Sequence, residues 1–205
     1  MQITLNDIGR RFNRDWIFRN INYTFTSGSS YAILGPNGSG KSTLLQIIAG
    51  SLSPSSGTIN YHHNDKEIEG SNIFNYLSVA TPYLELIEEF TLAEQIDFHF
   101  RFKKFYPDVT SATLVTLLGL EKAKHKYIKH FSSGMKQRVR LVLAFCSDTP
   151  LLLLDEPTSN LDSQGEDWYL QLIQNYTANR LVIIGSNQQN EYAFCNNKLQ
   201  IGDYK

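Results

Sequence analysis

The stretch YAILGPNGSGKSTLLQIIAG, residues 31–50, joins a short apolar strand to a helix through a glycine-rich loop. YAILG has the pattern of a strand that runs directly into the glycines. KSTLLQIIAG has four apolar residues at helical spacing and ends on Gly50, a residue that often terminates helices. A buried strand followed at once by a helix is typical of a parallel sheet covered by helices, so we predict an α/β fold.

Later segments extend this pattern. LLLLD (151–155) and RLVIIGS (180–186) are continuously apolar strands, and a helical pattern over residues 163–179 separates them. Residues 1–26 and 58–64 instead alternate between apolar and polar side chains, which is typical of strands with one face in water. The chain is therefore expected to contain a parallel sheet and a separate antiparallel one.

The loop GPNGSGKST (35–43) fits the phosphate-loop pattern G-x-x-x-x-G-K-[ST]. Its glycines let backbone N–H groups turn inward on the β- and γ-phosphates of a nucleotide, and Lys41 carries a charge that reaches the terminal phosphates. The Ser42 hydroxyl can ligate Mg²⁺. A glycine turn that binds nothing would not explain a lysine and hydroxyls at a helix N-terminus. The predicted binding residues are Gly35, Pro36, Asn37, Gly38, Ser39, Gly40, Lys41, Ser42 and Thr43.

The segment LLLLDEP (151–157) supplies the second half of such a site. Its apolar strand delivers Asp155 to the carboxyl edge of the sheet, where the carboxylate can hold Mg²⁺ through water. Glu156, one residue further on, can polarise the attacking water. A strand that simply ends in acidic residues is common, but its pairing with a phosphate loop favours the catalytic interpretation.

We therefore expect one domain, 1–205, with a P-loop NTPase (RecA-like) core. Residues 27–55 and 138–205 are predicted to form this core around a mostly parallel sheet. An N-terminal antiparallel β subdomain is predicted over 1–26 and 56–80, and a small inserted helical subdomain over 84–137.

The segment between about residues 85 and 130 has helical periodicity. Thr91 and Glu94 form the T-x-x-E capping box of a helix predicted over 92–106, and residues 109–120 predict a second helix. The aromatic side chains within 98–106 either pack this helical subdomain or form a docking surface for a partner.

The composition, 41% hydrophobic and 19% charged, is that of an ordinary globular protein. A formal net charge of -1 argues against a protein built mainly to bind nucleic acid, which needs clustered Lys and Arg. Cys146 and Cys195 lack metal-ligand spacing and are expected to be reduced thiols of a cytosolic protein. The start of the chain has no apolar signal-peptide region, and the longest apolar runs are far shorter than a membrane span, so no direct membrane insertion is expected.

Together, GPNGSGKST, FSSGMKQR (131–138) and LLLLDEPTSNLD (151–162) resemble the motifs of the ATP-binding subunit of an ABC transporter. Ser132, Ser133, Gly134 and Met135 stand where that family has the L-S-G-G-Q signature. Within SNLD, Asp162 stands at the D-loop carboxylate of the family. Phe12 stands where the family stacks an aromatic ring on adenine, although core packing explains a phenylalanine there equally well.

The resemblance implies ATP and Mg²⁺ as ligands, and two such domains packed head to tail. In that arrangement Ser132 and Gly134 act in trans on ATP held by the phosphate loop of a second ATP-binding subunit, in a homo- or heterodimer. It also implies a separate transmembrane permease and a peripheral location on the cytoplasmic face of the cell membrane. Within the family, the length and the segment ATPYLELIEEFTLAEQIDF (80–98) resemble short bacterial subunits of the haem-exporter kind.

Three positions depart from the family pattern. Thr81 stands near the usual Q-loop glutamine, and Ser186 with Asn187 replaces the usual switch pair T-H. Met135 replaces the signature glutamine and is expected to matter least. Because Asn187 can hydrogen-bond to a γ-phosphate but cannot carry a proton, we expect slow hydrolysis through Glu156, with Lys41 and Asn187 as its catalytic companions.

Two other kinds of protein carry a phosphate loop. A soluble ABC-type ATPase that acts on ribosomes or DNA usually has two ATPase units in one chain or a long coiled-coil insertion, and neither is present here. A small-molecule P-loop kinase has no use for a signature loop or a D-loop and needs an arginine-rich lid. The sequence therefore favours a transport ATPase, with the soluble ABC-type ATPase as the alternative.

Overall fold

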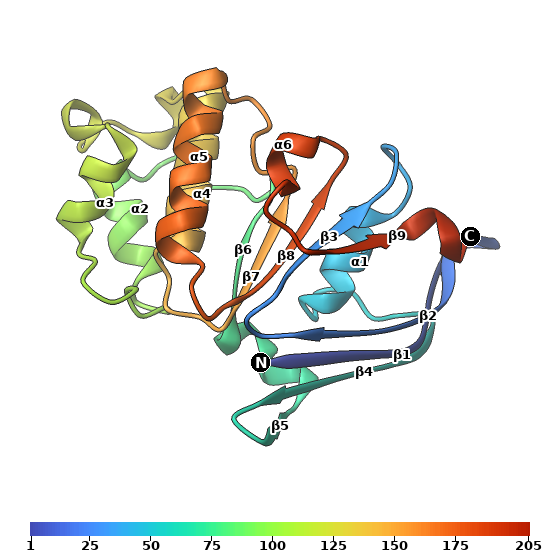
Figure 1. The fold of residues 1–205 in the computed structure, drawn as a ribbon. Helices are drawn as coiled ribbons and strands as arrows, with labels where there is room; N and C mark the ends of the chain where they lie inside the picture. Colours follow the sequence, from blue (N-terminus) through green and yellow to red (C-terminus); the bar gives the residue numbers. More distant parts are fainter.

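The computed structural model describes residues 1–205 (Figure 1). In chain order its strands and helices are β1 Gln2–Phe12, β2 Asp15–Thr26, β3 Ser30–Leu34, α1 Lys41–Ile48, β4 Ser56–His63, β5 Lys66–Ile68, β6 Leu77–Ala80, α2 Leu92–His99, α3 Ser111–Leu118, α4 Ser133–Phe145, β7 Leu151–Asp155, α5 Ser163–Tyr176, β8 Leu181–Ser186, α6 Gln189–Tyr192 and β9 Asn197–Gln200. Short 3₁₀ turns join several of these elements. None of the helices has the length and apolar character needed to cross a membrane.

The central sheet contains five parallel strands in the order β6-β7-β8-β3-β9, which confirms the predicted parallel sheet. Leu34 at the end of β3 pairs with Ser186 at the end of β8, and Asp155 at the end of β7 pairs with Gly185. These three strands therefore end at one edge, and the loops that follow them emerge side by side. Ligands of open α/β sheets bind at this edge.

Alternate residues of each central strand fill two separate cores. Leu152 and Leu154 of β7 belong to one buried cluster, together with side chains of α4 and α5. Leu151 and Leu153 belong to the other, together with side chains of α1 and the antiparallel sheet. Figure 1 shows α4 and α5 on one face of the parallel sheet and α1 on the other. Because both faces are buried, these strands need apolar residues at every position.

The second sheet is antiparallel, with the order β2-β1-β4-β5. It confirms the strand patterning of residues 1–26, but β6 is not part of it. Leu77–Ala80 pair in parallel with Leu151–Leu154, so the predicted antiparallel assignment of 56–80 is wrong for this strand. A strand of four residues has too little periodicity to show which sheet it joins. Its pairing with β7, which is distant in the sequence, places it in the parallel sheet. The predicted boundary at 137/138 also falls inside α4.

The helix predicted over 92–106 is shorter than expected, because α2 ends at His99. Beyond it the backbone bonds to the segment that follows α4: the Tyr106 N–H donates to the Cys146 carbonyl at 2.7 Å, and the Asp148 N–H donates to the Lys104 carbonyl at 2.9 Å. These tertiary hydrogen bonds replace the helical ones. The second predicted helix is confirmed as α3.

Both thiols are buried, and neither forms a disulfide. Burial raises the pKa of Cys146 to about 12 and that of Cys195 to about 12. Because the thiolate is the reactive form, both side chains pack as small apolar groups, as the sequence predicts.

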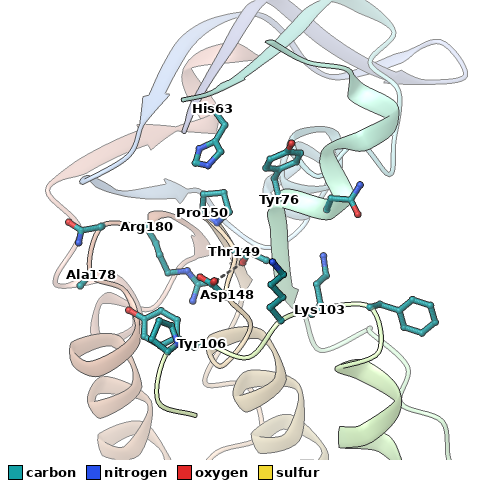
Figure 2. A pocket seen from close by; sticks show the side chains of 14 residues that line it. His63, Tyr76, Lys103, Tyr106, Asp148, Thr149, Pro150, Ala178 and Arg180 are labelled. Atoms are coloured by element: carbon teal, nitrogen blue, oxygen red, sulfur yellow. Dashed lines mark hydrogen bonds between the residues drawn. The ribbon is translucent and has the colours of Figure 1, made fainter. Parts of the chain in front are cut away.

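A cavity of ≈ 600 Å³ lies at the amino-terminal edge of the parallel sheet, away from the phosphate loop (Figure 2). Tyr76, Lys103, Tyr106, Asp148 and Arg180 are among the residues that line it. Several cationic side chains line this cavity, but the most buried of them, Arg180, already donates hydrogen bonds to groups within the chain.

The Arg180 guanidinium donates to the carbonyl oxygens of Phe145 at 2.9 Å and Tyr176 at 3.1 Å, which are the last residues of α4 and α5. It also donates to the Ser78 and Thr149 hydroxyls, both at 2.8 Å. A cation at two helix C-termini is favourable, and burial lowers the pKa of Arg180 to about 10. Arg180 therefore links the C-terminal ends of α4 and α5 to Ser78 of β6 by hydrogen bonds.

Replacing this guanidinium tests its structural role. We expect Arg180→Met to lower the free energy of unfolding by about 2–4 kcal/mol, because it leaves buried acceptors unpaired. Urea unfolding measures the change. Arg101→Met, at an exposed position, is the control and should be neutral. Equal stability of the two variants would contradict the assigned role.

Candidate functional site

The glycine-rich loop between β3 and α1 has the backbone that the sequence predicts. Gly38 and Gly40 have φ values of 76° and 109°, in the region that favours glycine. A Cβ atom on Gly40 would lie 2.5 Å from the Ile17 side chain, so the loop packs closely against β2. At Gly40, the N-cap of α1, no side chain accepts from the helix, which leaves the first N–H groups available to an anion.

Lys41 begins α1 and is only 4% exposed. Its ammonium donates to the carbonyl oxygens of Gly35 at 3.0 Å and Pro36 at 3.3 Å. The Lys41 ammonium is therefore bound to backbone carbonyls of its own loop, and no carboxylate lies within salt-bridge distance of it. A lysine in this position provides a charge for a terminal phosphate.

Asp155 and Ser42 form the part of the site that fits a divalent cation. Asp155 is 5% exposed, and its Oδ1 has no hydrogen-bond partner. Burial raises the pKa of Asp155, while a hydrogen bond from Ser42 acts in the opposite direction. No group of three or more His, Cys, Asp or Glu side chains is placed to hold a metal. The available oxygens suit Mg²⁺, which usually takes one or two protein oxygens and completes its shell with phosphate and water.

Glu156 follows Asp155 in a strained conformation with a φ of 42°. Its N–H donates to the Gly185 carbonyl at 2.9 Å, which fixes the turn against the end of β8. The residue lines the same pocket, of ≈ 240 Å³, as Lys41 and Ser42. Strained residues cluster at functional sites, and this one brings a carboxylate to the phosphate loop.

Asn187 and Thr81 lie on two sides of this loop. The Asn187 amide donates to the Asn37 side-chain oxygen at 2.8 Å, so the residue at the switch position contacts the phosphate loop directly. Thr81 lines a groove of ≈ 410 Å³ that also contains Ser42 and Asp155. Both residues therefore lie next to the predicted site.

The signature residues open on a different pocket, of ≈ 440 Å³, which contains Ser132, Ser133, Gly134, Met135 and Asp162. Ser132 is the N-cap of α4, and its hydroxyl oxygen accepts from the Met135 N–H at 3.2 Å. A Cβ atom on Gly134 would lie 2.9 Å from the Asn160 carbonyl oxygen, so the loops touch closely there. The N-cap of α5 is Asp162, which accepts from the Gly165 N–H at 2.8 Å.

Phe12 is 48% exposed at the end of β1, which excludes core packing. The Arg10 guanidinium lies over its ring, 4.6 Å from the centroid. Phe12 does not line the pocket of the phosphate loop, so adenine stacking stays a prediction.

Two residues that line the phosphate-loop pocket were not predicted, namely Ile17 and Tyr83. Ile17 could have been suspected from its place just after the tip of the β1–β2 turn. Tyr83, which is 81% exposed, stands two residues beyond Thr81. The sequence signal that could have found Tyr83 is an aromatic residue only two positions beyond the candidate Thr81.

Comparisons with known sequences show which family the chain is similar to. The sequence model of the family described as ABC transporter matches residues 18–159. The cytochrome c biogenesis ATP-binding export protein CcmA of Rhizobium etli is 31% identical over 196 residues, 92% of this chain and 89% of that protein. The sulfate/thiosulfate import ATP-binding protein CysA of Mesostigma viride is 30% identical over 202 residues, 92% of this chain and 56% of that protein.

Solved structures show the same fold. An ATP-binding subunit of an ABC transporter has a TM-score of 0.83 at 23% identity, over 98% of this chain and 87% of that one. The ATP-binding cassette MJ0796, solved as a dimer with ADP and Pi, has a TM-score of 0.80 at 21% identity, over 98% of this chain and 95% of that one.

The N-cap at the signature loop can be tested alone. Ser132→Ala should lower the free energy of unfolding by about 1 kcal/mol, because it removes the cap of α4. Thermal or urea unfolding measures this loss. Ser133→Ala is the matched control, since the Ser133 side chain is exposed and makes no hydrogen bond within the chain. A loss of the same size in both variants would contradict the capping role.

Proposed function

Because the chain belongs to the ABC transporter family and is its ATP-binding ATPase domain, we propose that it binds and hydrolyses Mg-ATP at a head-to-tail dimer interface. In this proposal the closure of the dimer drives a conformational change in a separate membrane permease. The chain would then work peripherally, on the cytoplasmic face of the cell membrane. One observation carries the proposal: the phosphate loop and the signature loop open on two pockets that share no residue.

The phosphate loop and the signature loop each form half of the proposed ATP site, and a complete site would require the other half from a second chain. The phosphate-loop pocket has a lysine, helix N–H groups and the Glu156 carboxylate, yet Ser132 and Gly134 line a different pocket. The Ser132 oxygen accepts a hydrogen bond from its own helix, which leaves its O–H free to donate to a phosphate. The N-terminus of α4 adds partial positive charge there. These donors support a role in trans on ATP bound by a partner.

Within the chain, each residue has a distinct task in the proposed reaction. Lys41 and the N–H groups of residues 38–43 bind and orient the phosphates. Ser42 and Asp155 would hold Mg²⁺, which supplies charge neutralisation on the phosphate oxygens. Glu156 polarises the attacking water and accepts its proton. Phe12 is proposed to stack on the adenine.

Turnover is proposed to be slow. The Asn187 side chain donates to Asn37 and can donate to a γ-phosphate in the same way, but an amide cannot transfer a proton. Thr81 lies in the groove beside Ser42 and Asp155, but its side chain is shorter than the glutamine it replaces. A general acid–base group accelerates a reaction roughly 10²–10⁴-fold. Without a histidine at position 187 to act beside Glu156, the chain is expected to lack part of this acceleration.

An apolar groove beside the site supports a protein partner. Phe74, Tyr83 and Leu84 are exposed large apolar residues that line the groove containing Thr81. Exposed apolar patches of this kind mark interaction surfaces. We propose that the permease docks here, where its movement would reach Ser42 and Asp155 directly. Relatives include ATP-binding export proteins of cytochrome c biogenesis, which supports a subunit of the haem-exporter kind. The cargo itself would be selected by the permease.

The dimer proposal predicts an ATP-dependent change of size. Glu156→Gln should bind Mg-ATP without hydrolysing it and elute as a dimer in size-exclusion chromatography. The control is Glu156→Gln combined with Lys41→Ala, which should bind no nucleotide and remain monomeric. If Glu156→Gln never dimerises with ATP, even with the permease present, the head-to-tail arrangement is wrong.

The switch position predicts a gain of function. Asn187→His should raise ATP turnover at least about tenfold, because imidazole can exchange protons near pH 7. Asn187→Ala should lower ATP turnover further, because it removes the amide that is proposed to donate to the γ-phosphate. Steady-state phosphate release measures both. Vigorous turnover in the wild type that Asn187→Ala does not diminish would rule out a switch role for this residue.

A further inference from the structure

Glu191 of α6 is a fully buried carboxylate, with an exposed fraction of 0%. Its Oε1 accepts from the Thr158 N–H at 2.8 Å and from the Thr158 hydroxyl at 2.6 Å. Its Oε2 accepts from the Ser186 hydroxyl. No cation lies within salt-bridge distance, so three hydrogen bonds alone compensate its desolvation.

A buried carboxylate destabilises the fold unless each of its hydrogen bonds is kept. A buried polar group that loses its partner bears the full cost of desolvation, and a carboxylate only accepts. All three neighbouring groups donate, so the carboxylate satisfies each of them. In a glutamine of the same shape one oxygen becomes an N–H₂ group, which cannot accept from the Thr158 N–H and can pair with Ser186 only if that hydroxyl turns from donor to acceptor. Glu191 therefore specifies one relative position of Thr158 and Ser186.

These two residues belong to the two catalytic segments. Thr158 stands two residues after Glu156, and Ser186 comes directly before Asn187. The segments already share the backbone bond from Glu156 to the Gly185 carbonyl. Glu191 adds a side-chain bridge between Thr158 and Ser186, so the two segments are joined by side-chain as well as backbone hydrogen bonds.

The other flank of the loop is tied to the signature helix. Gln137 of α4 is fully buried, and its amide donates to the Pro157 carbonyl at 2.9 Å. The loop after Glu156 is thus held between α4 on one side and α6 on the other. Beyond it, the backbone of Asn160 approaches Gly134 of the signature loop.

We propose that Glu191 is a positioning residue that holds the Glu156 loop and the Asn187 segment in one register, so that the two move as a unit when the ATP site closes. This inference rests on the proposed function. Glu191 touches no residue of the phosphate loop through a hydrogen bond, so it acts on the hydrolytic step rather than on ATP binding.

The test uses the full chain and four variants. Glu191→Gln removes the acceptor-only carboxylate at constant shape, and Thr158→Val removes its hydroxyl partner. The double variant measures their coupling. Tyr169→Phe is the matched structural control, because its hydroxyl donates to the Glu191 backbone carbonyl at 2.9 Å and leaves the carboxylate untouched.

Two readouts separate positioning from general destabilisation. Single-turnover hydrolysis with excess enzyme, over hours if needed, gives the rate of the chemical step, and titration with Mg-ATP gives its Kd. We expect Glu191→Gln to slow hydrolysis on the order of 10- to 100-fold with Kd within about threefold of wild type, since small misplacements of reacting groups cost rates of this size. Hydrogen exchange should speed up in residues 158–162 and 186–188 and stay unchanged in the central strands.

The double variant should be no slower than Glu191→Gln, and Tyr169→Phe should keep the wild-type rate. A Glu191→Gln variant with wild-type hydrolysis and exchange overturns the inference, as does a loss that lies entirely in Kd or multiplies with that of Thr158→Val. A wild-type chain that binds Mg-ATP no better than Lys41→Ala would instead contradict the proposed function, so the two failures are distinguishable.

Discussion

Parallel hydrogen bonding among β3, β7 and β8 is the constraint on which the rest of the molecule depends. Because Leu34 pairs with Ser186 and Asp155 with Gly185, three segments that are far apart in the sequence end at one edge. The phosphate loop, the pair Asp155 and Glu156, and the segment around Asn187 come at the ends of these strands and therefore lie at the same edge of the sheet. Parallel strands need crossover connections, and the helices that provide them also cover both faces of the sheet.

Some buried polar atoms have hydrogen-bond partners within the chain and others have none, and the unpaired ones include Arg10 Nε, His63 Nδ1 and Arg180 Nε as well as two atoms beside the phosphate loop. Arg180 and Gln137 donate to carbonyl oxygens and tie helices to loops. The Ser39 hydroxyl and Asp155 Oδ1, by contrast, are buried without partners beside the phosphate loop. An unpaired buried group costs free energy, so these atoms mark the place where a ligand would complete the structure.

The signature loop gives the chain a second surface of the same chemical kind. An exposed serine and a glycine at the start of a helix offer donors to an anion, but they line a pocket that shares no residue with the phosphate-loop pocket of the same chain. Proposed head-to-tail pairing would bring complementary halves together and would make hydrolysis conditional on assembly. With Asn187 in place of an acid–base residue, the proposed slow turnover would make ATP-driven closure, rather than rapid hydrolysis, the main contribution to the cycle.

The sequence by itself determined the local elements and the chemistry of the loops, because phosphate binding needs glycine, lysine and hydroxyl groups at fixed spacing. Continuous apolar strands likewise predicted a sheet buried on both faces. Only the tertiary structure placed β6 in the parallel sheet, ended α2 at His99 and brought Ile17 and Tyr83 to the pocket. It also placed Glu191 between Thr158 and Ser186, across 33 residues of sequence. These features depend on long-range hydrogen bonds and side-chain packing, which local periodicity does not encode.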